Sequence, residues 1–540
     1  MGNGESSHRA RPEDGAPTDV DVAIVGYGPV GQALAAHLGR GGHRVAVFER
    51  FEDPYPLPRA VHIDHEIMRL LQGLGVAYEL AGEMLAIHDY RWFGADGEPL
   101  LTMHSPNPSS SGWEPDYLFH QPDLETALDA AARKWPSVTV ERGWSAESLE
   151  QHDAHADLTL RRTDAGAGSP VRTVHARWVI GADGANSFVR DACGISLRDL
   201  GFQERWLVAD VIPSEMNALA ALPPACQWCD PRRPTTHVRS GPRHHRWEFM
   251  LLPGERAEDF EDAQRAWSLL APWCTPADTE LTRSTVYEFR SLLAETMRDG
   301  RALLVGDAAH LTPPFLGQGL CSGLRDAANV AWKLDLILRG LAPATLLDSV
   351  DAERLSQNEW IITLAIGLGK VLCELDPAAA AERDSTLRGA DQPPPLEMAP
   401  LSGGLLGRGE DGAPAPLAGT LGVQARVRGA SGEGLLDDVL GPGFALITAI
   451  GDPLDGLAAK DRELLAALGC RLASLEAGAP HGVHDLDGRL GAWLAGVGAH
   501  AALVRPDLYV FATAATPAAV PALIDDLRSQ LGAPTAITTT

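Results

Sequence analysis

Three glycines near the N-terminus have the spacing of a phosphate-binding turn. The turn Gly26-Tyr-Gly28-Pro-Val-Gly31 follows the apolar run Val20–Val25, and Glu49 lies 23 residues after Gly26. Gly26 permits a tight turn, Gly28 lets the backbone approach a pyrophosphate, and Gly31 allows close packing of helix on strand. The start of the helix offers free N–H groups to an anion, and Glu49 can accept hydrogen bonds from a ribose hydroxyl. The pattern therefore predicts a dinucleotide site.

Two later motifs place a carboxylate directly after an apolar run. The first is Gly181-Ala-Asp183-Gly184, and the second is Gly306-Asp307-Ala-Ala-His310. The second motif is followed by a stretch rich in proline and glycine, residues 313–323. Each motif alone could be a polar turn at the end of a strand. Because both follow the glycine turn in this order, their joint appearance has little chance of being a coincidence.

Hydrophobic periodicity predicts the elements that must position these residues. Buried parallel strands are expected at Val20–Val25 and Arg44–Phe48, with a helix at Val30–Leu38 between them. This is a βαβ unit of about 30 residues. Further amphipathic helices are expected at Gln121–Arg133 and Gly319–Leu338. The fold class that follows is α/β.

Shifts in composition and pattern divide the chain into several parts. Alternating β-type patterns mark an inserted domain, and an Ala-, Pro- and Gly-rich stretch separates an α/β module at the C-terminus. The expected parts are a disordered leader at 1–18, a discontinuous nucleotide-binding domain at 19–85 with 116–200 and 288–375, an inserted β-rich substrate domain at 86–115 with 201–287, a linker at 376–402 and the C-terminal module at 403–540.

Composition excludes several classes of partner. The chain has 45 Lys+Arg and 72 Asp+Glu, a net charge of −27, which argues against nucleic acid and against an anionic membrane surface. The chain has no run of about 18 apolar residues, so no transmembrane helix is predicted. The 7 cysteines are scattered and no secretory signal is recognisable. These features together predict a cytoplasmic protein.

The motifs together resemble those of a known family, the single-component flavoprotein aromatic hydroxylases, which have the para-hydroxybenzoate hydroxylase fold. The resemblance covers about residues 19–375 through the glycine turn and the motifs at Asp183 and Asp307. A branch that acts on phenylpropanoid-like acids matches further at His120–Glu125, Cys229–Pro234, Arg246–Leu251 and Ser322–Leu334. That branch has a thioredoxin-like tail, so the resemblance implies a thioredoxin-like domain at 403–540. This part of the chain has Cys470 alone and no C-x-x-C, which favours a structural or packing role.

The resemblance implies a tightly bound FAD. It places the helix that begins at Gly319 with its positive end toward the flavin. Relatives often have Asn where this chain has Cys321, and we interpret Cys321 as a small residue packed at the start of that helix. The full set of expected FAD-binding residues is Gly26, Gly28, Pro29, Val30, Gly31, Glu49, Arg50, Arg59, Gln121, Asp183, Gly306, Asp307, Pro314, Gly317, Gly319, Leu320 and Cys321.

The resemblance also implies the reaction. NADH or NADPH reduces FAD, O2 adds to form a C4a-hydroperoxyflavin, and the electron-rich ring of a phenol is hydroxylated. The favoured substrate is a small aromatic acid similar to 3-(3-hydroxyphenyl)propionate. Expected catalytic residues are Pro314, His62 and Tyr287, with His237 and His310 as further candidates for a base. Expected substrate contacts are Trp228, Phe249 and Phe315, and no metal site is expected.

Several alternatives stay open at this level. A flavin oxygenase on this scaffold could act on a larger polyketide-like metabolite. A flavin reductase without oxygenation, or a redox-controlled interaction protein, would have the same nucleotide motifs. Gly441-Pro-Gly443 lacks the spacing of a second dinucleotide turn, so oxygenases and reductases with two such domains fit poorly. The sequence does not distinguish NADH from NADPH, and it leaves the regiochemistry and a homodimer open.

Overall fold

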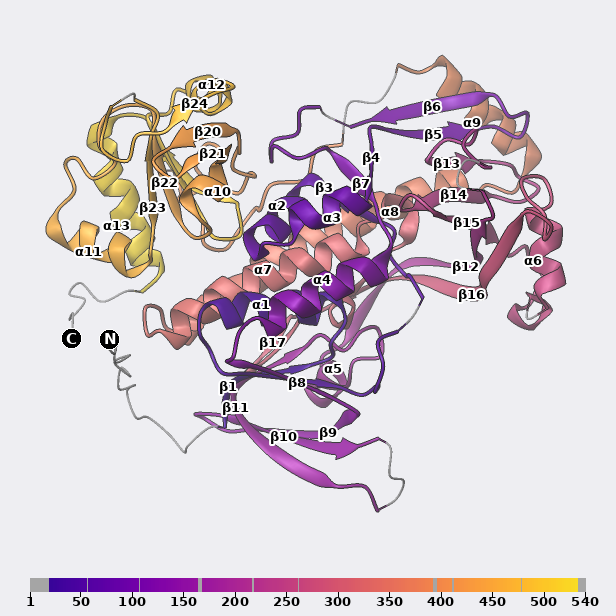
Figure 1. The fold of residues 1–540 in the computed structure, drawn as a ribbon, viewed down its shortest axis with the longest axis horizontal. Helices are drawn as coiled ribbons and strands as arrows, with labels where there is room; N and C mark the ends of the chain where they lie inside the picture. The colour runs from indigo at the N-terminus through magenta and orange to yellow at the C-terminus, as the bar shows by residue number, and fades with distance from the viewer. Residues whose placement is uncertain are drawn as a thin grey trace.

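The computed structural model describes residues 19–532, apart from 56, 106, 164–167, 216–217, 261, 392–395, 410–411 and 477. The leader expected at 1–18 lies outside the described residues. Figure 1 shows a central group of helices over a sheet, a second sheet on one side, and the C-terminal part on the other. Among the described residues, no helix is both long enough and apolar enough to cross a lipid bilayer.

A largely parallel sheet forms the centre of the first unit. Its strand order is β17-β18-β11-β1-β2-β8, and β9 and β10 extend it from β11. Strand β1 pairs in parallel with both β11 and β2, so Val22 lies between Trp178 and Val45. The strands are β1 Val20–Val25, β2 Val45–Glu49, β8 Val138–Arg142, β9 Trp144–Gln151, β10 Ala156–Arg162, β11 Val171–Gly181, β17 Arg298–Asp299 and β18 Ala302–Leu304. The strand predicted at Val20–Val25 is confirmed, as expected for a continuous apolar run.

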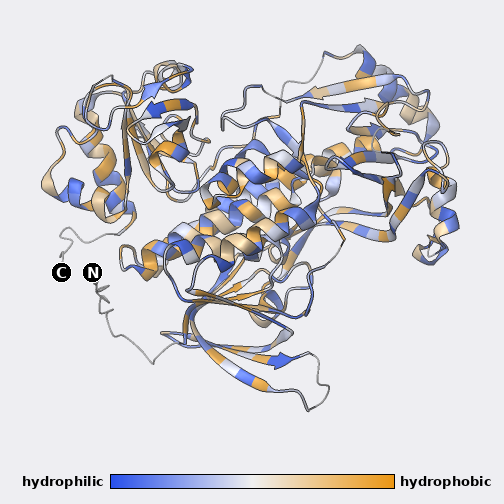
Figure 2. Ribbon diagram, viewed as in Figure 1, coloured by the Kyte–Doolittle hydropathy of each residue, from blue (hydrophilic) through white to orange (hydrophobic). Residues whose placement is uncertain are grey.

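Helices pack against this sheet, and local signals set where they begin. Pro29 occupies the first turn of α1, and Asp64 caps α2 by accepting hydrogen bonds from the N–H groups of Glu66 and Ile67. The central helices have both apolar and polar residues, as the mixed colours of Figure 2 show. The helices of this unit are α1 Pro29–Arg40, α2 His65–Leu74, α3 Ala77–Glu83, α4 Gln121–Arg133, α5 Phe188–Ala192 and α7 Gly319–Leu338.

The inserted unit is built on a second sheet, of strand order β19-β16-β12-β15-β14-β13-β5-β6. Its long antiparallel strands β12 and β16 continue past the boundaries expected at 200/201 and 287/288. The strands are β5 Asp89–Phe93, β6 Pro99–His104, β12 Leu197–Pro213, β13 Ala225–Trp228, β14 Thr235–Ser240, β15 His244–Met250, β16 Thr279–Ala294 and β19 His310–Leu311. Helices α6 Ala263–Leu270 and α8 Ser356–Leu372 accompany it, and a small sheet β3-β7-β4 consists of His62–Asp64, Asp116–Leu118 and Leu85–Ile87.

The segment expected as a linker, residues 376–402, contains a helix. Helix α9 spans Pro377–Gly389, and Asp376 caps it by accepting hydrogen bonds from backbone N–H groups of its first turn. Arg383 of α9 donates to the carbonyl of Cys229, which ties the helix to the second sheet. Although the segment is rich in proline, Asp376 and Pro377 precede several alanines, and this order of residues is typical of a helix start.

The C-terminal unit is a mixed α/β structure. Its main sheet has the order β23-β22-β25-β26, with β22 and β23 parallel and the other pairs antiparallel. A smaller sheet has the order β21-β20-β24. The elements are β20 Arg426–Gly429, β21 Gly432–Leu435, α10 Leu436–Leu440, β22 Ala445–Thr448, α11 Ala459–Ala467, β23 Arg471–Ser474, β24 His484–Asp485, α12 Arg489–Gly496, β25 Ala501–Val504, β26 Val510–Ala514 and α13 Val520–Gln530. The thioredoxin-like assignment of this unit stays a prediction.

The C-terminal unit packs on α7 through a buried interface. The rings of Trp332 and Phe444 meet edge to face with centroids 5.7 Å apart. Beside them, Glu353 accepts from Lys333 at 2.8 Å and from Arg505 at 2.6 Å, and all three side chains are fully buried. A buried charge without a partner would cost several kcal/mol, so removal of any one of these three groups would destabilise the interface.

Candidate active site

A large cavity lies between the three units in the described part of the chain. Its volume is about 1780 Å³, and its wall includes the β1–α1 turn, the start of α7, the second sheet and part of the C-terminal unit. Most of the residues expected from the sequence line it. These are Gly26, Gly28, Pro29, Val30, Glu49, Arg50, Arg59, His62, Gln121, Asp183, Tyr287, Asp307, Pro314, Phe315, Gly317, Gly319 and Leu320. Gly31, Gly306, Cys321, Trp228 and Phe249 are not part of this wall.

The glycine turn is shaped to receive an anion. A Cβ at Gly26 would lie 2.3 Å from the carbonyl oxygen of Ala182, and one at Gly31 would lie 2.3 Å from that of Gly26. A Cβ at Gly28 would meet no protein atom within 4 Å. Two glycines therefore allow tight packing, and Gly28 leaves open space before the start of α1. No side chain caps that helix start, so its N–H groups are available to a phosphate.

Glu49 stands at the end of β2 with its carboxylate fixed by the backbone. It accepts hydrogen bonds from the N–H of Tyr27 at 2.9 Å and from that of Phe51 at 3.0 Å. Arg50 lies over the Phe51 ring at 4.7 Å. The carboxylate remains at the cavity wall, where it suits the hydroxyls of a ribose.

Gln121 positions the segment that contains Arg59. Its side-chain oxygen accepts from the N–H of Arg59 at 2.8 Å and of Ala60 at 2.7 Å, and its nitrogen donates to Glu125 at 2.6 Å. The Arg59 guanidinium lies 4.8 Å over the ring of Tyr55. Arg59 is thus presented to the cavity as a cation, whereas direct contact of Gln121 with a ligand stays a prediction.

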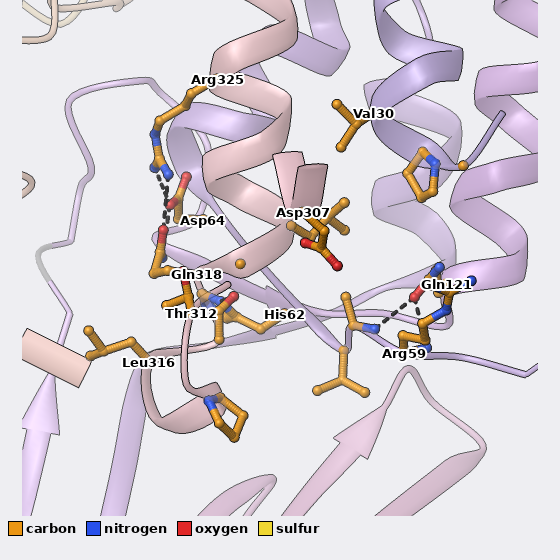
Figure 3. Close-up of a pocket in the computed structure, with 18 of the residues that line it drawn as sticks. Val30, Arg59, His62, Asp64, Gln121, Asp307, Thr312, Leu316, Gln318 and Arg325 are labelled. Carbon is orange, nitrogen blue, oxygen red and sulfur yellow. Dashed lines mark hydrogen bonds and ion pairs between the residues drawn. The ribbon is translucent and has the colours of Figure 1, made fainter. Parts of the chain in front are cut away.

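Two carboxylates enter the cavity at the ends of strands. Figure 3 shows Asp307 directed into the cavity. Desolvation by burial raises the pKa of Asp307. Asp183 accepts a hydrogen bond from the N–H of Val189 at 3.1 Å and one from the hydroxyl of Ser187. Burial also raises the pKa of Asp183. Asp307 is thus available to hydroxyl groups of a ligand, and Asp183 fixes the turn before α5.

A buried network holds the turn beside Asp307. Asp326 of α7 accepts from the N–H of Gly306 at 3.0 Å, from His310 at 2.6 Å and from Arg354 at 2.7 Å. Burial opposes the charge, but His310 and Arg354 lower the pKa of Asp326. His310 is therefore engaged in structure and has no path to a substrate.

The start of α7 is open to the cavity. Residues Pro314–Leu316 form one turn of 3-10 helix, Gly317 has a φ of +64° and the 20-residue helix α7 begins at Gly319 without a side-chain cap. Figure 3 shows Arg325 and Gln318 both bonded to Asp64. This end of the cavity thus combines free N–H groups with the positive end of a long helix. Cys321 is fully buried in the core behind it, consistent with a packing role.

His62 touches this turn and is fixed at both ring nitrogens. Nε2 is 2.8 Å from Oδ1 of Asp116, and Nδ1 is 3.3 Å from the carbonyl oxygen of Gly317. Burial disfavours the charged ring, but the hydrogen bond and charge of Asp116, together with Cys321, outweigh burial and raise the pKa of His62 well above its ordinary value. With an oxygen at each nitrogen, His62 acts as a fixed cation beside the turn, not as a free base.

This geometry makes a prediction about stability. The raised pKa of His62 means that its contribution is fully present below the unfolded pKa of about 6.5 and is lost as pH rises through the folded pKa. We expect Asp116→Asn to lower the free energy of unfolding by about 2 kcal/mol below pH 6.5, and by less at higher pH. Denaturant titration of both proteins at several pH values measures this difference.

A matched control uses an exposed pair of the same type. His104 and Asp89 are 2.8 Å apart, but their side chains are 58% and 35% exposed. Asp89→Asn should therefore cost about 0.5 kcal/mol or less. Equal effects of the two substitutions, or an Asp116→Asn effect that does not change with pH, would contradict a stabilising ion pair between His62 and Asp116.

The second sheet contributes charged groups to which the sequence motifs assign no individual role. Asp210 accepts from Arg246 at 2.7 Å and from Arg283 at 3.3 Å, and all three are buried. The Arg283 guanidinium lies 4.6 Å over the ring of Tyr287. Glu248 lines the cavity beside them, and burial raises its pKa. The period of two along β15 could have indicated that Arg246 and Glu248 share a face.

Two of the expected substrate contacts lie elsewhere. Phe249 follows Glu248 on β15, so it faces the opposite side of the sheet, where it packs with Trp273 at 6.0 Å. Trp228 lies between Phe93 and Trp273, at 6.2 and 5.1 Å. Both rings belong to the packing behind the sheet, because strand residues alternate in side. His237 is also behind the sheet, and burial lowers its pKa to about 3.

Phe315 belongs to both environments. It lines the cavity, yet it is 8% exposed and packs edge to face against Phe202 at 5.5 Å and Trp206 at 5.9 Å.

A cluster of side chains of the kind that can bind a metal ion lies outside the cavity. The ligand atoms of His152, His155 and Asp157 come within 4.8 Å of one another at the β9–β10 hairpin. These three residues are not part of the cavity wall.

The fold and the cavity are those of a dinucleotide-binding protein. A family model described as FAD binding domain matches residues 19–365, and one described as HcaD C-terminal domain matches residues 419–530. The glycine turn, the open helix starts and Asp307 fit the pyrophosphate, ribose and hydroxyl groups of that cofactor. The chain belongs to the family of FAD-dependent aromatic hydroxylases.

Individual relatives match this chain over nearly its whole length. The chain is 40% identical to a probable NADH-specific resorcinol 4-hydroxylase of Rhodococcus jostii, over 96% of each chain. It is 34% identical to a 3-(3-hydroxy-phenyl)propionate/3-hydroxycinnamic acid hydroxylase of Burkholderia vietnamiensis, over 91% of this chain and 93% of that one. Among solved structures, aklavinone-11 hydroxylase with FAD and aklavinone matches with a TM-score of 0.75 at 26% identity, over 96% of this chain and 100% of that one.

Proposed function

We propose that this protein is an NADH-dependent hydroxylase of small phenols of the resorcinol or 3-(3-hydroxyphenyl)propionate class. The observation that carries the proposal is one cavity that joins the turn at Gly28 and the start of α7 at Gly319 to the polar face of the second sheet at Glu248. The names of the two relatives support the substrate class, and one of them supports NADH as reductant.

Bound FAD would supply the redox chemistry, since it can accept a hydride and activate O2. The residues that would hold it are those of the glycine turn with Glu49, Arg59 and Asp307. The start of α7 offers N–H groups and a positive helix end to negative charge on the cofactor. With FAD and the phenol bound, walls from three units would limit the access of bulk water to the reacting groups, which favours transfer of oxygen to the ring over loss of peroxide.

Glu248 is the group that we assign to accept the proton of the phenol. Loss of this proton raises the electron density of the ring, which makes the ring a better nucleophile. The carboxyl lies on the cavity side of β15, paired in register with Val208 and Thr236, which also line the cavity. Desolvation raises the pKa of Glu248, although Arg246 opposes this, so its carboxylate is a stronger base than in water.

Tyr287 has the complementary role in this proposal. Burial raises the pKa of Tyr287, so its hydroxyl keeps its proton at neutral pH. It can therefore donate a hydrogen bond to the substrate oxygen. His62 holds the turn at Gly317 in place, and its two occupied nitrogens leave it no proton to exchange with a substrate.

NADH oxidation by the FAD-loaded protein, with product analysis, tests the proposal. Resorcinol and 3-(3-hydroxyphenyl)propionate should stimulate oxidation and yield hydroxylated products. Turnover only with polycyclic phenols would favour a larger metabolite as substrate. NADH oxidation that no phenol stimulates, without a hydroxylated product, would favour a reductase.

A further inference from the structure

The cavity wall is incomplete without the C-terminal unit. Six of its residues line the cavity together with the first two units: Leu417, Thr420, Leu421, Val423, Arg489 and Trp493. The last two belong to α12. A domain with only a packing role would have no need to reach this wall.

These residues meet a segment that comes from the other side of the cavity. The segment consists of residues 107–116 and leads into β7, and Ser110 and Asp116 on it line the cavity, as does Ser105 after β6. It is an irregular stretch, so its position depends on the hydrogen bonds made to its backbone.

The C-terminal unit supplies several of those hydrogen bonds. The N–H of Gln424 donates to the carbonyl of Ser110 at 2.8 Å, and its side-chain nitrogen donates to that of Ser111 at 2.6 Å. Arg489 donates to the carbonyl of Ser109 at 2.5 Å. Ser109, Ser111 and Gln424 are buried, so these hydrogen bonds are shielded from competing water.

The far end of the segment reaches the turn before α7. Asp116 accepts a hydrogen bond from Ser105 and lies 2.8 Å from Nε2 of His62, which in turn contacts the carbonyl of Gly317. The segment therefore contacts Arg489 of the C-terminal unit near one end and, through Asp116 and His62, the turn before α7 at the other.

We propose that the C-terminal unit completes the substrate cavity, and that Arg489 is a positioning residue that holds segment 107–116 over the bound phenol. The inference rests on the proposed function and deepens it. Without the contact from Arg489, the segment opens more often, the phenol dissociates faster and water enters. The expected signature is weaker phenol binding together with NADH oxidation that yields peroxide instead of product.

The test compares Arg489→Met, which removes the donor, with Arg489→Lys, which keeps one. Both are made in the full-length FAD-loaded protein, and Arg489 is only partly buried, so the core stays intact. Arg489→Met should raise the Kd and the KM for 3-(3-hydroxyphenyl)propionate or resorcinol about tenfold and lower the product formed per NADH, with unchanged flavin content. Arg489→Lys should recover most of both.

The matched control is Arg426→Met, at an exposed arginine of the same unit that pairs with Glu433. It should leave the Kd, KM and coupling at wild-type values. Phenol binding is followed separately from turnover by the change in flavin absorbance. Wild-type affinity and coupling in Arg489→Met, in an enzyme that hydroxylates phenols, overturn this inference alone. Absence of phenol binding and product in the wild type overturns the proposed function, and with it this inference.

Discussion

A Gly28→Val variant is expected to fold as the wild type does and to be purified without FAD. Gly28 has φ −75° and ψ −177°, an extended conformation that valine adopts readily. The added side chain meets no protein atom, because a Cβ at this position has nothing within 4 Å. It would instead occupy the space in front of the start of α1, where a pyrophosphate must come close to the backbone.

The expected loss of affinity is large. We anticipate FAD binding at least about 100-fold weaker, equivalent to about 2.7 kcal/mol. The cost to the fold should be small, since replacing glycine at a helix start that has no side-chain cap removes no hydrogen bond of the protein. Bound flavin is measured from the absorbance of the purified protein, and the Kd from fluorescence quenching on reconstitution.

Gly82→Val is the matched control. Gly82 is exposed on α3, and a Cβ there also has no neighbour within 4 Å. This variant should retain wild-type flavin. If Gly28→Val binds FAD as tightly as the control does, the β1–α1 turn is not the pyrophosphate site.

Replacement of Glu248 by glutamine is expected to have the largest effect on turnover. Glutamine keeps the shape of the side chain but cannot accept the proton of the phenol. We expect kcat/KM at neutral pH to fall about 100-fold, within the range found for loss of a general base. FAD content should not change, because Glu248 lies on the second sheet and the glycine turn lies on the first.

The dependence of kcat/KM on pH identifies the group that accepts the proton of the phenol more specifically than a single rate at neutral pH does. Burial raises the pKa of Glu248, so the wild-type kcat/KM should fall on the acid side as the pH drops through that pKa and the carboxylate is protonated. This acid limb should be missing in Glu248→Gln. Tyr287→Phe should keep the limb and raise the KM, since it removes only a hydrogen-bond donor.

Glu258→Gln, at a side chain that is 65% exposed, serves as the control and should behave as the wild type. A Glu248→Gln enzyme with wild-type kcat/KM and an intact acid limb would show that another group takes the proton.

The nucleotide-binding part was largely predictable because its signals are local. The strand Val20–Val25 and the helices Gln121–Arg133 and Gly319–Leu338 occur at the bounds expected from hydrophobic periodicity and helix-start signals. The glycine turn also has a local cause, since crowding at Gly26 and open space at Gly28 follow from how a strand turns into a helix.

The substrate end was harder because it depends on which face of a sheet is covered. Alternation along β15 puts Arg246 and Glu248 on one side and Trp247 and Phe249 on the other. The sequence of β15 alone allows either face to line a cavity. The packing of helix α6 and its neighbours against Trp247 and Phe249 determines which face is covered. The aromatic side was expected to meet the substrate, but in the structure it is the packed side.

Contacts between distant segments gave no signal in the sequence. Arg489 meets Ser109 across 380 positions, and Arg69 pairs with Asp437 across 368. An isolated arginine on a surface helix has no pattern that distinguishes such a partner from water. The part played by the C-terminal unit in the cavity could therefore emerge only from the fold.

The most direct test of the central claim is turnover under 18O2 with the purified, FAD-loaded enzyme, NADH and resorcinol or 3-(3-hydroxyphenyl)propionate. Mass spectrometry of the product measures the origin of the new hydroxyl. The account predicts that each turnover adds one oxygen atom to the ring and that this atom comes from O2. NADH oxidation with no labelled aromatic product from either phenol, in enzyme that retains its flavin and binds the phenol, would contradict it.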